Sequence, residues 1–451
     1  MMALRRTAVF AVLALLAAAV LRPAEPRAEV FDPETFTLDN GLEVVVVTNR
    51  RAPIVTQMLW YKVGAADDPR GRSGLAHVTE HLMFKGTPEH PDGEFSQIVA
   101  RLGGEQNAFT SYDYTGYYQT VAREHLGRIM ALEADRMQNL KLEAADVTTE
   151  SQVVVQERKQ RVENRPEGKL SEMASASLFL HHPYGTPIIG WSAELKAITQ
   201  ADAERFYDHW YAPNNAVLVI AGDVTADEVK PLAKKHYGDI PRAEVPDRNR
   251  VTEPEQTAPR RVSLESAQVN QPSLTIRYLA PSYRTAEDTT TPYAAQVLSE
   301  LLGSGPTSRL YRELVMKQEI AVSAGSWYSP NRWDTTSFGF YVSPRPGTPI
   351  DKVETALRAE IDKLLTDGVS EDEVREAKDR LRAQVAYARD DMRTAPRVLG
   401  RALVTGQSIA ELESWPSRIA EITPADVEAA AEQIFQAESS VTSVLKAKPA
   451  S

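Results

Sequence analysis

A segment rich in proline and charge divides this chain of 451 residues near its middle. From Asp239 to Arg261 the segment has neither the helical nor the strand period of apolar residues, which is typical of an exposed linker. About 200 residues lie on each side of it, and a chain of this length exceeds one ordinary core. We therefore expect two domains.

The two flanking segments have the same order of predicted elements, which indicates an internal duplication. In the first, 42–49 and 54–64 alternate or are β-branched like strands, and 75–87 has helical periodicity that ends at Gly86. In the second, 272–280 predicts a strand and 293–305 predicts a helix that Gly303 ends. We expect an α/β (α+β) fold made of two similar halves.

The first 28 residues differ from the rest of the chain. Arg5 and Arg6 precede a run of mostly apolar residues from 7 to 21, a pattern that predicts a secretory signal peptide over 1–28. A membrane span needs about 20 apolar residues, and Arg22 interrupts this run, although an uncleaved anchor is the alternative. We expect export to the periplasm and no membrane span in the mature chain.

Composition argues against nucleic-acid binding and excludes sites made of cysteine. The formal net charge of -11 argues against nucleic acid as a partner, because binding of that kind rests on Lys and Arg neutralising phosphates. The chain has no cysteine, so disulfides and thiolate ligands are excluded. Any zinc site must use histidine and carboxylate ligands.

The strongest chemical motif is His77-x-x-Glu80-His81. Residues four apart lie on one face of a helix, so the two imidazoles can reach one metal ion. Glu80 lies beside that ion without having to bind it, which suits a general base acting on water. The motif inverts the order of the commoner His-Glu-x-x-His. The alternative is a helix whose histidines are exposed or hydrogen-bonded.

A second predicted helix, 147–164, supplies candidates for a further ligand. Glu150 and Glu157 project from one face of it. Zinc in hydrolytic sites takes three protein ligands, so one of these acids is expected to complete the set. The alternative for each is an ordinary solvated charge. In the second half of the chain, Gln296, Ser299 and Glu300 stand near the positions of the motif, so that half lacks the ligands.

At these motifs the sequence resembles the inverzincin peptidases of the pitrilysin, insulysin and mitochondrial processing peptidase family, most closely the bacterial processing-peptidase-like branch. The stretches 74–88, 103–118 and 153–158 look like the zinc helix, the substrate-edge segment and the helix of the glutamate ligand. The resemblance implies one Zn²⁺ per chain, held by His77, His81 and Glu157. It also implies that Glu150 assists catalysis from behind the site.

The resemblance further implies a fold and a way of binding substrate. The fold would be two homologous α/β-roll domains that form a clamshell around a chamber: a catalytic zinc-binding domain at 29–238, the linker at 239–261 and a second domain without metal at 262–447. Asn107, Ala108 and Phe109 match positions that meet an extended peptide by β-augmentation. The alternative for this stretch is a plain edge strand with aromatic packing.

One departure from the family pattern concerns the second half. Relatives with a whole site carry an Arg and a Tyr seven residues apart, whereas this chain has Val315 and Val322. Valine can neither donate a hydrogen bond nor stabilise an oxyanion. We therefore expect a heterodimer with a related partner that binds no metal and supplies the Arg/Tyr pair. Arg312 or Tyr311 acting instead is the alternative.

The sequence thus predicts a zinc metalloendopeptidase that hydrolyses peptides bound as an added β-strand in an enclosed chamber. The predicted catalytic groups are Glu80 and Glu150. The alternative functions are a non-catalytic peptide-binding or assembly subunit of the same fold, or a chaperone that sequesters peptides.

Overall fold

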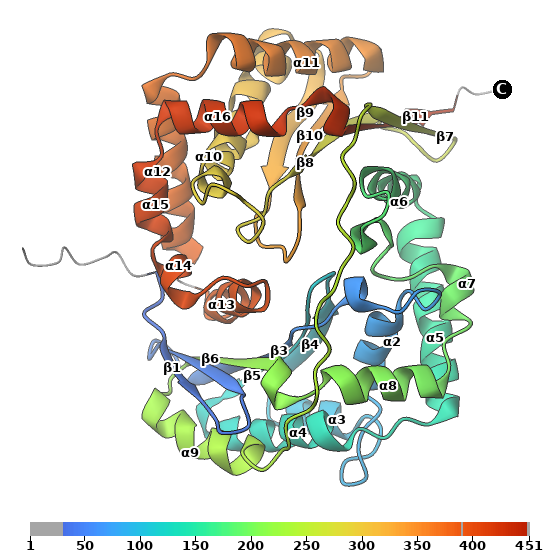
Figure 1. The fold of residues 1–451 in the computed structure, drawn as a ribbon, viewed down its shortest axis with the longest axis vertical. Coiled ribbons are helices and arrows are strands. Elements are labelled where there is room, and N and C mark those ends of the chain that lie inside the picture. Colours follow the sequence, from blue (N-terminus) through green and yellow to red (C-terminus); the bar gives the residue numbers. More distant parts are fainter. Residues whose placement is uncertain (1–29, 389–390, 449–451) are drawn as a thin grey trace, which may run out of the picture.

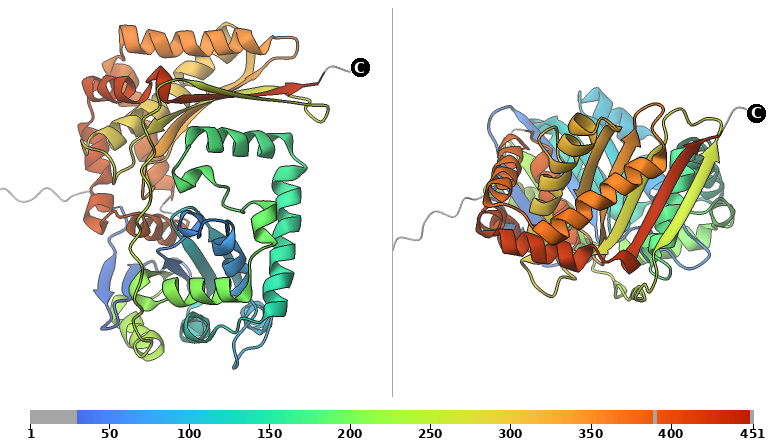
Figure 2. Two further views of the ribbon diagram at one scale, coloured as in Figure 1. Left: turned by 45° about the vertical axis from the view of Figure 1, so that its right-hand side comes forward. Right: turned by 90° about the horizontal axis from the view of Figure 1, so that it is seen from above.

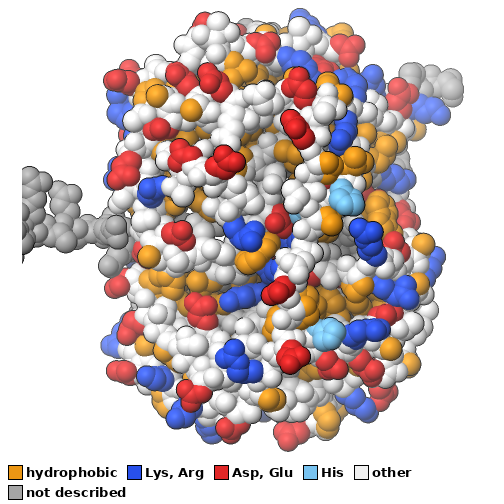
Figure 3. Space-filling view, viewed as in Figure 1, with side chains coloured by type: hydrophobic (Ala, Val, Ile, Leu, Met, Phe, Trp, Pro, Cys, Tyr) orange, Lys and Arg blue, Asp and Glu red, His pale blue; other side chains and the backbone are white. Residues whose placement is uncertain are grey.

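The computed structural model describes residues 30–388 and 391–448. The predicted signal peptide, 1–28, lies outside the described residues. Two mixed α/β halves lie one above the other, and a long extended segment runs along the side of both (Figure 1). On the face seen in Figure 3, charged side chains of both signs are interspersed. Among the described helices, none combines the length and apolar character that a membrane span requires.

The first half is built on a six-stranded sheet of order β1-β2-β6-β3-β5-β4. Its strands are β1 (Glu34–Thr37), β2 (Glu43–Thr48), β3 (Ile54–Tyr61), β4 (Glu105–Thr110), β5 (Thr115–Ala122) and β6 (Ala216–Gly222). β2 and β6 pair in parallel, and the other neighbours are antiparallel. The central strands are nearly continuous runs of buried β-branched and apolar residues, because both faces of the sheet are covered.

The second half repeats this arrangement in a five-stranded sheet of order β7-β11-β8-β10-β9. Its strands are β7 (Arg260–Ser266), β8 (Ser273–Ala280), β9 (Ala321–Tyr328), β10 (Thr336–Pro344) and β11 (Ser440–Ala447). β7 pairs in parallel with β11, as β2 does with β6, and the remaining pairs are antiparallel. β9 is the edge strand that corresponds to β4. The shared order and directions confirm the predicted fold class of two similar α/β halves.

Helices cover one face of each sheet within its own half (Figure 2). The first half contains α2 (Leu75–Leu82), α3 (Glu94–Arg101), α4 (Leu126–Asn139), α5 (Ala144–Arg158), α6 (Pro166–Leu178), α7 (Ser192–Leu195), α8 (Gln200–Trp210) and α9 (Ala226–Tyr237). The second contains α10 (Thr291–Gly303), α11 (Ile350–Asp367), α12 (Glu371–Ala388), α13 (Thr394–Val404), α14 (Ile409–Glu413), α15 (Trp415–Glu421) and α16 (Pro424–Ile434).

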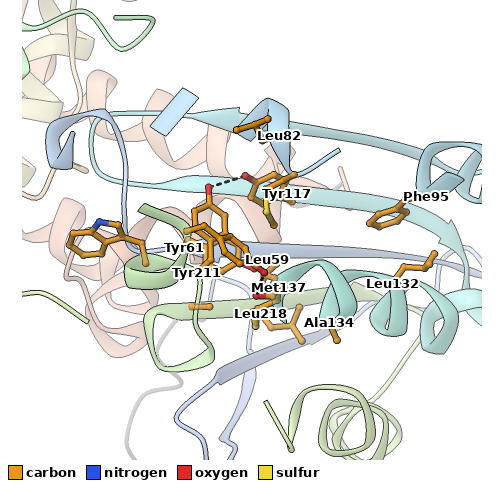
Figure 4. Close-up of a cluster of buried hydrophobic side chains, with 14 of the residues drawn as sticks. Leu59, Tyr61, Leu82, Phe95, Tyr117, Leu132, Ala134, Met137, Tyr211 and Leu218 are labelled. Carbon is orange, nitrogen blue, oxygen red and sulfur yellow. Dashed lines mark hydrogen bonds between the residues drawn. The ribbon is translucent and has the colours of Figure 1, made fainter. Parts of the chain in front are cut away.

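Aromatic residues fill the core beneath the motif helix. Tyr61 and Tyr117 from the first sheet pack with Tyr211, and the hydroxyls of Tyr117 and Tyr211 lie 3.0 Å apart (Figure 4). Each buried phenol of this pair therefore has a partner, as burial requires. This core fixes the position of α2 above the sheet.

The two halves exchange helices across their interface. α6, from the first half, packs on β7 and β11, where Ala174 and Leu178 meet Val441. α13, from the second half, packs on β3 and β6 of the first sheet. At Gly400 of α13 a Cβ atom would lie 2.1 Å from Nε1 of Trp60, so only glycine permits this close approach. Each half therefore completes the other's core.

The segment between the halves differs from the predicted exposed linker. Residues 241–259 form no helix or strand, as expected, but β7 already begins at Arg260. The Arg250 guanidinium is buried and contacts the Asp67 carboxylate at 2.8 Å and the Asp334 carboxylate at 3.2 Å, one in each half. The expectation of an exposed segment is wrong for Arg250, because its guanidinium forms ion pairs with both halves. The predicted domain boundaries stay a proposal.

Candidate active site

The motif helix α2 is shorter than the sequence predicted. It begins after Gly74, which has a left-handed φ of 87°, and ends at Leu82 rather than at Gly86. The chain continues in tight turns, with the Lys85 amide donating to the Leu82 carbonyl at 2.9 Å. At the other end, the Asp68 carboxylate accepts from the backbone amides of Gly74 and Ala76 and so caps the helix. The early end leaves all three motif residues inside the helix.

Helix α5 brings a carboxylate to the two histidines. The Glu157 Oε2 atom lies 3.7 Å from Nε2 of His77 and 3.6 Å from Nε2 of His81. One ligand atom from each residue falls within 4.8 Å of the others. Ligand atoms around a tetrahedral zinc lie about 3.4 Å apart, since each bond is about 2.1 Å long. The two distances from Glu157, 3.7 and 3.6 Å, are close to this value, and a donor set of two histidines and a carboxylate suits Zn²⁺.

Two cations and a second carboxylate hold these ligands. The Arg161 guanidinium lies 2.7 Å from Oε1 of Glu157, which leaves Oε2 directed at the histidines. Glu150 lies behind the site, with Oε2 3.1 Å from Nδ1 of His81 and Oε1 2.9 Å from Nζ of Lys85. A carboxylate on the far nitrogen fixes the ring orientation of a ligating histidine and raises its basicity.

The electrostatics of the two histidines differ in the metal-free chain. Burial lowers the pKa of His77 to about 4, despite the nearby Glu157 carboxylate. Burial also opposes charge on His81, but the hydrogen bond with Glu150 and the nearby Glu157 carboxylate outweigh it and raise its pKa to about 9. His77 is therefore neutral at pH 7, ready to bind a metal, whereas His81 holds a proton that a metal would displace.

Glu80 lies beside this cluster without belonging to it. Its carboxylate is largely buried, and burial raises its pKa, an effect that a hydrogen bond from Thr110 opposes. The Thr110 hydroxyl donates to Oε2 of Glu80 at 2.5 Å. Sequence reasoning gave Thr110 no role, although it directly follows the predicted substrate-binding residues. A buried, oriented carboxylate next to a metal site can accept a proton from water.

A cavity of about 780 Å³ opens onto these groups. The motif residues and Glu157 line it, together with Asn107, Ala108 and Phe109 on β4. β4 is the outermost strand of its sheet, so its free edge can pair with an extended peptide. The Phe109 ring packs 4.9 Å from the ring of Trp60, so aromatic packing and an open edge coexist in this strand.

The second half has a direct ion pair at the corresponding helix contact. On α10 the buried Glu300 carboxylate accepts from Nε of Arg380 at 2.9 Å and from Nε2 of Gln384 at 3.2 Å, both on α12. Gln296 bonds to the Tyr283 hydroxyl. Within residues 30–388 and 391–448, the trio of His77, His81 and Glu157 is the only His/acid group close enough to hold a metal.

The positions expected to carry an Arg and a Tyr do not face the cavity. Val315 is buried in the π-helical turn Tyr311–Lys317, and Val322 is exposed on β9. The alternative residues do not replace them, since Tyr311 packs against the second core and Arg312 is exposed. None of the four lines the cavity around His77.

Comparison with known proteins matches both halves. Residues 43–191 match the insulinase family model (peptidase family M16), and residues 197–381 match the peptidase M16 inactive domain. The zinc protease PqqE of Helicobacter pylori is 32% identical over 348 residues, covering 76% of this chain and 77% of that protein.

Solved structures share the fold. A protease from Helicobacter pylori superposes with a TM-score of 0.84 at 28% identity, covering 92% of this chain and 99% of that chain. The periplasmic protease PqqL of Escherichia coli gives a TM-score of 0.78 at 20% identity, covering 94% of this chain but 48% of that one. With both halves matched and a relative above 30% identity, the chain belongs to peptidase family M16, the insulinase family.

Proposed function

We propose that this chain is the zinc-bearing catalytic subunit of an endopeptidase. The observation that carries the proposal is the meeting of His77, His81 and Glu157 at ligand spacing, with Glu80 beside them, in a cavity that the free edge of β4 borders. Ligands, base and peptide-binding edge are the parts that peptide hydrolysis requires.

Each residue has a distinct task in this proposal. His77, His81 and Glu157 bind Zn²⁺, which when bound would polarise the scissile carbonyl and lower the pKa of water. Glu80 accepts the proton from water and returns it to the leaving amine. Thr110 orients the Glu80 carboxylate. Glu150 acts through His81, whose ring it orients.

The substrate class follows from β4. A peptide that adds to this edge is bound through its backbone, so Asn107, Ala108 and Phe109 would hold extended segments of varied sequence. The cavity of about 780 Å³ has the size of a small-ligand site and admits a few residues of an unfolded chain. Short unstructured peptides are therefore the proposed substrates.

The catalytic subunit needs a partner in this proposal. Val315 and Val322 leave the substrate-binding Arg/Tyr pair missing from the chain. The chain covers 48% of PqqL, so that longer protein has a further half beyond the part that matches. A related chain without metal ligands would take the place of that half and complete the chamber. The predicted signal peptide at 1–28 supports a periplasmic location for the proposed assembly.

The catalytic assignment is tested with Glu80→Gln. The amide cannot accept a proton, so we expect peptide hydrolysis to fall by about 10²- to 10⁴-fold with one zinc retained per chain. Hydrolysis of a fluorogenic peptide and metal content by mass spectrometry are measured on the same preparation. Glu89→Gln, an exposed change in the loop that follows α2, is the control. Full activity in Glu80→Gln would refute the role of this residue.

The partner is tested by reconstitution. The chain is purified alone and together with its co-expressed homologue that lacks the histidine motif. We expect weak hydrolysis from the single chain and a rise of about 100-fold or more in the pair, the size of one lost oxyanion donor. Strong hydrolysis by the single chain would show that its site is complete without a partner.

A second candidate function is a peptide-binding or assembly subunit, or a chaperone, without turnover. The match of residues 197–381 to a domain described as inactive favours it. That match contains none of the proposed ligands, whereas His77, His81 and Glu157 all lie within the other match, 43–191. Zinc content together with zinc-dependent turnover separates the two functions.

A further inference from the structure

Arg277, on β8, is a partly buried cation with no acidic partner within the described residues. Two other buried arginines are paired with acids, Arg136 with Glu133 at 2.7 Å and Arg158 with Glu172 at 2.7 Å, whereas Arg248 donates to backbone carbonyls. Charges taken from water are normally compensated in this way. An uncompensated guanidinium in a chain of net charge -11 calls for an explanation.

The contacts of Arg277 are two serine hydroxyls of the exchanged helix α6. Nη1 donates to Oγ of Ser175 at 3.0 Å, and Nη2 donates to Oγ of Ser171 at 3.2 Å. Both serines line the cavity of the candidate active site, and the contact with Ser171 is open to solvent. Nε of Arg277 is buried with no acceptor. The second half thus places a positive charge directly behind two serines that line a cavity of the first half.

Tyr112 extends this group of donors. Its side chain lines the same cavity, and the Arg332 guanidinium lies 4.9 Å from the centre of its ring. Nη1 of Arg332 is also buried without an acceptor. Burial raises the pKa of Tyr112, so its hydroxyl keeps its proton and can donate. Two serines and a phenol therefore line the cavity, the Arg277 guanidinium lies behind the serines, and the Arg332 guanidinium stacks on the phenol.

The nearby acids do not fill that position. Both oxygens of Glu172, which lines the cavity, accept from the Arg158 guanidinium, at 2.7 Å and 2.9 Å. Asp113 is bound by Arg250 and by the Tyr184 hydroxyl. These carboxylates are neutralised by other partners, and the charge of Arg277 is left for a ligand.

We propose that Arg277, together with Ser171, Ser175 and Tyr112, forms a subsite that binds a carboxylate of the peptide substrate. The planar guanidinium and flanking hydroxyls match the geometry of a carboxylate. The inference rests on the proposed peptidase function, which it extends to substrate preference. The carboxylate comes from the carboxyl terminus of the peptide or from an acidic side chain.

The test compares four fluorogenic peptides that share one sequence. They have a free or an amidated carboxyl terminus, and Glu or Gln at one position. For the reconstituted enzyme, we expect kcat/KM about tenfold higher for a peptide with the recognised carboxylate than for its neutral counterpart. The free-terminus pair and the Glu/Gln pair distinguish the two sources. Equal values for all four peptides would overturn the subsite while leaving the peptidase function standing.

The Arg277→Gln variant then tests whether Arg277 causes the preference for peptides that carry the carboxylate. We expect the ratio between charged and neutral peptides to fall to about one, mainly through KM, because a ground-state contact is lost. Arg261→Gln, which removes an exposed guanidinium paired with Glu354, is the control and keeps the ratio. A ratio unchanged in Arg277→Gln would overturn the proposal.

Two further measurements keep the test decisive. Should Arg277→Gln fail to fold, Tyr112→Phe replaces it, with a smaller expected loss of the ratio, and an unchanged ratio there counts against the subsite. Should no peptide be cleaved, the peptidase function fails, and anisotropy of the labelled peptides tests the subsite by itself. Equal binding of charged and neutral peptides would then overturn it.

Discussion

The helix pair α2/α5 of the first half and the pair α10/α12 of the second occupy corresponding places. The side chains between the two helices differ from one pair to the other. In the second half, Glu300 and Arg380 bridge the helices directly at 2.9 Å. In the first half, His77 and His81 face Glu157 across 3.6 to 3.7 Å, a spacing wider than a hydrogen bond. The first pair is also bridged directly, between His81 and Glu150 at 3.1 Å, but within the described residues it alone also carries ligand atoms spaced for a metal ion.

The difference suggests that, in a duplicated fold, one helix pair can bind a metal while the corresponding pair stabilises its half. A bridged helix contact is satisfied by itself, whereas the Nε2 atoms of His77 and His81 lie too far from Glu157 for a hydrogen bond. The first pair should therefore govern zinc binding, and the second should govern stability. Three changes test this division.

The largest effect is expected for Glu157→Gln. A neutral amide is a poor zinc ligand, and loss of a residue that only supports a ligand already costs 10- to 100-fold in affinity, so we expect the zinc Kd to rise by more than about 100-fold. Competition with a chromophoric chelator measures it. Glu163→Gln, less than two turns further on, is the matched control because Glu163 pairs with Arg158 instead. Unchanged zinc affinity in Glu157→Gln would break the comparison.

A smaller effect, and on stability instead, is expected for Glu300→Ala. The change leaves Arg380 and Gln384 without their shared acceptor, so the free energy of unfolding should fall by about 2 kcal/mol, with zinc affinity unchanged. Urea unfolding measures it. Glu376→Ala is the control, since this acid lies 3.9 Å from Arg380 at the surface and should cost at most about 0.5 kcal/mol. Equal losses in both variants would contradict the account.

The last effect concerns pH, and its size over a single pH unit is the smallest of the three. The His81 pKa of about 9 in the metal-free chain means that zinc must displace a proton at lower pH, whereas His77, at about 4, is already neutral. Apparent zinc affinity should therefore rise about tenfold per unit between pH 7 and 9 and then level off. Calorimetry at pH 7 in buffers of different ionisation enthalpy should show one proton released. Zinc binding without proton release would contradict this.

The parts of the site that share a helix face could be predicted from the sequence. The spacing of His77 and His81 fixes one face whatever surrounds it, and the strand patterns around residues 44–48 and 274–280 follow from β-branched and apolar runs. The functional roles of Glu80, Glu150 and Glu157 stay predictions, but the structure places all three around the same two rings.

The remaining features depend on contacts between distant segments, which no local pattern encodes. Thr110 reaches Glu80 only because β4 lies beside α2, and Arg277 reaches a serine that lines the cavity only because α6 packs on the opposite half. The buried ion pair of Arg250 with Asp67 could not be predicted, because the surrounding segment has the composition of a linker. The early end of α2 at Leu82 likewise reflects tertiary packing.

The central claim is that one zinc binds in the first half and none in the second. Crystals grown with zinc and measured at its absorption edge test it most directly. The account predicts one anomalous peak between α2 and α5, about 2.1 Å from Nε2 of His77 and of His81 and from a Glu157 oxygen. A zinc-loaded crystal without a peak there, or with one between α10 and α12, would contradict the account.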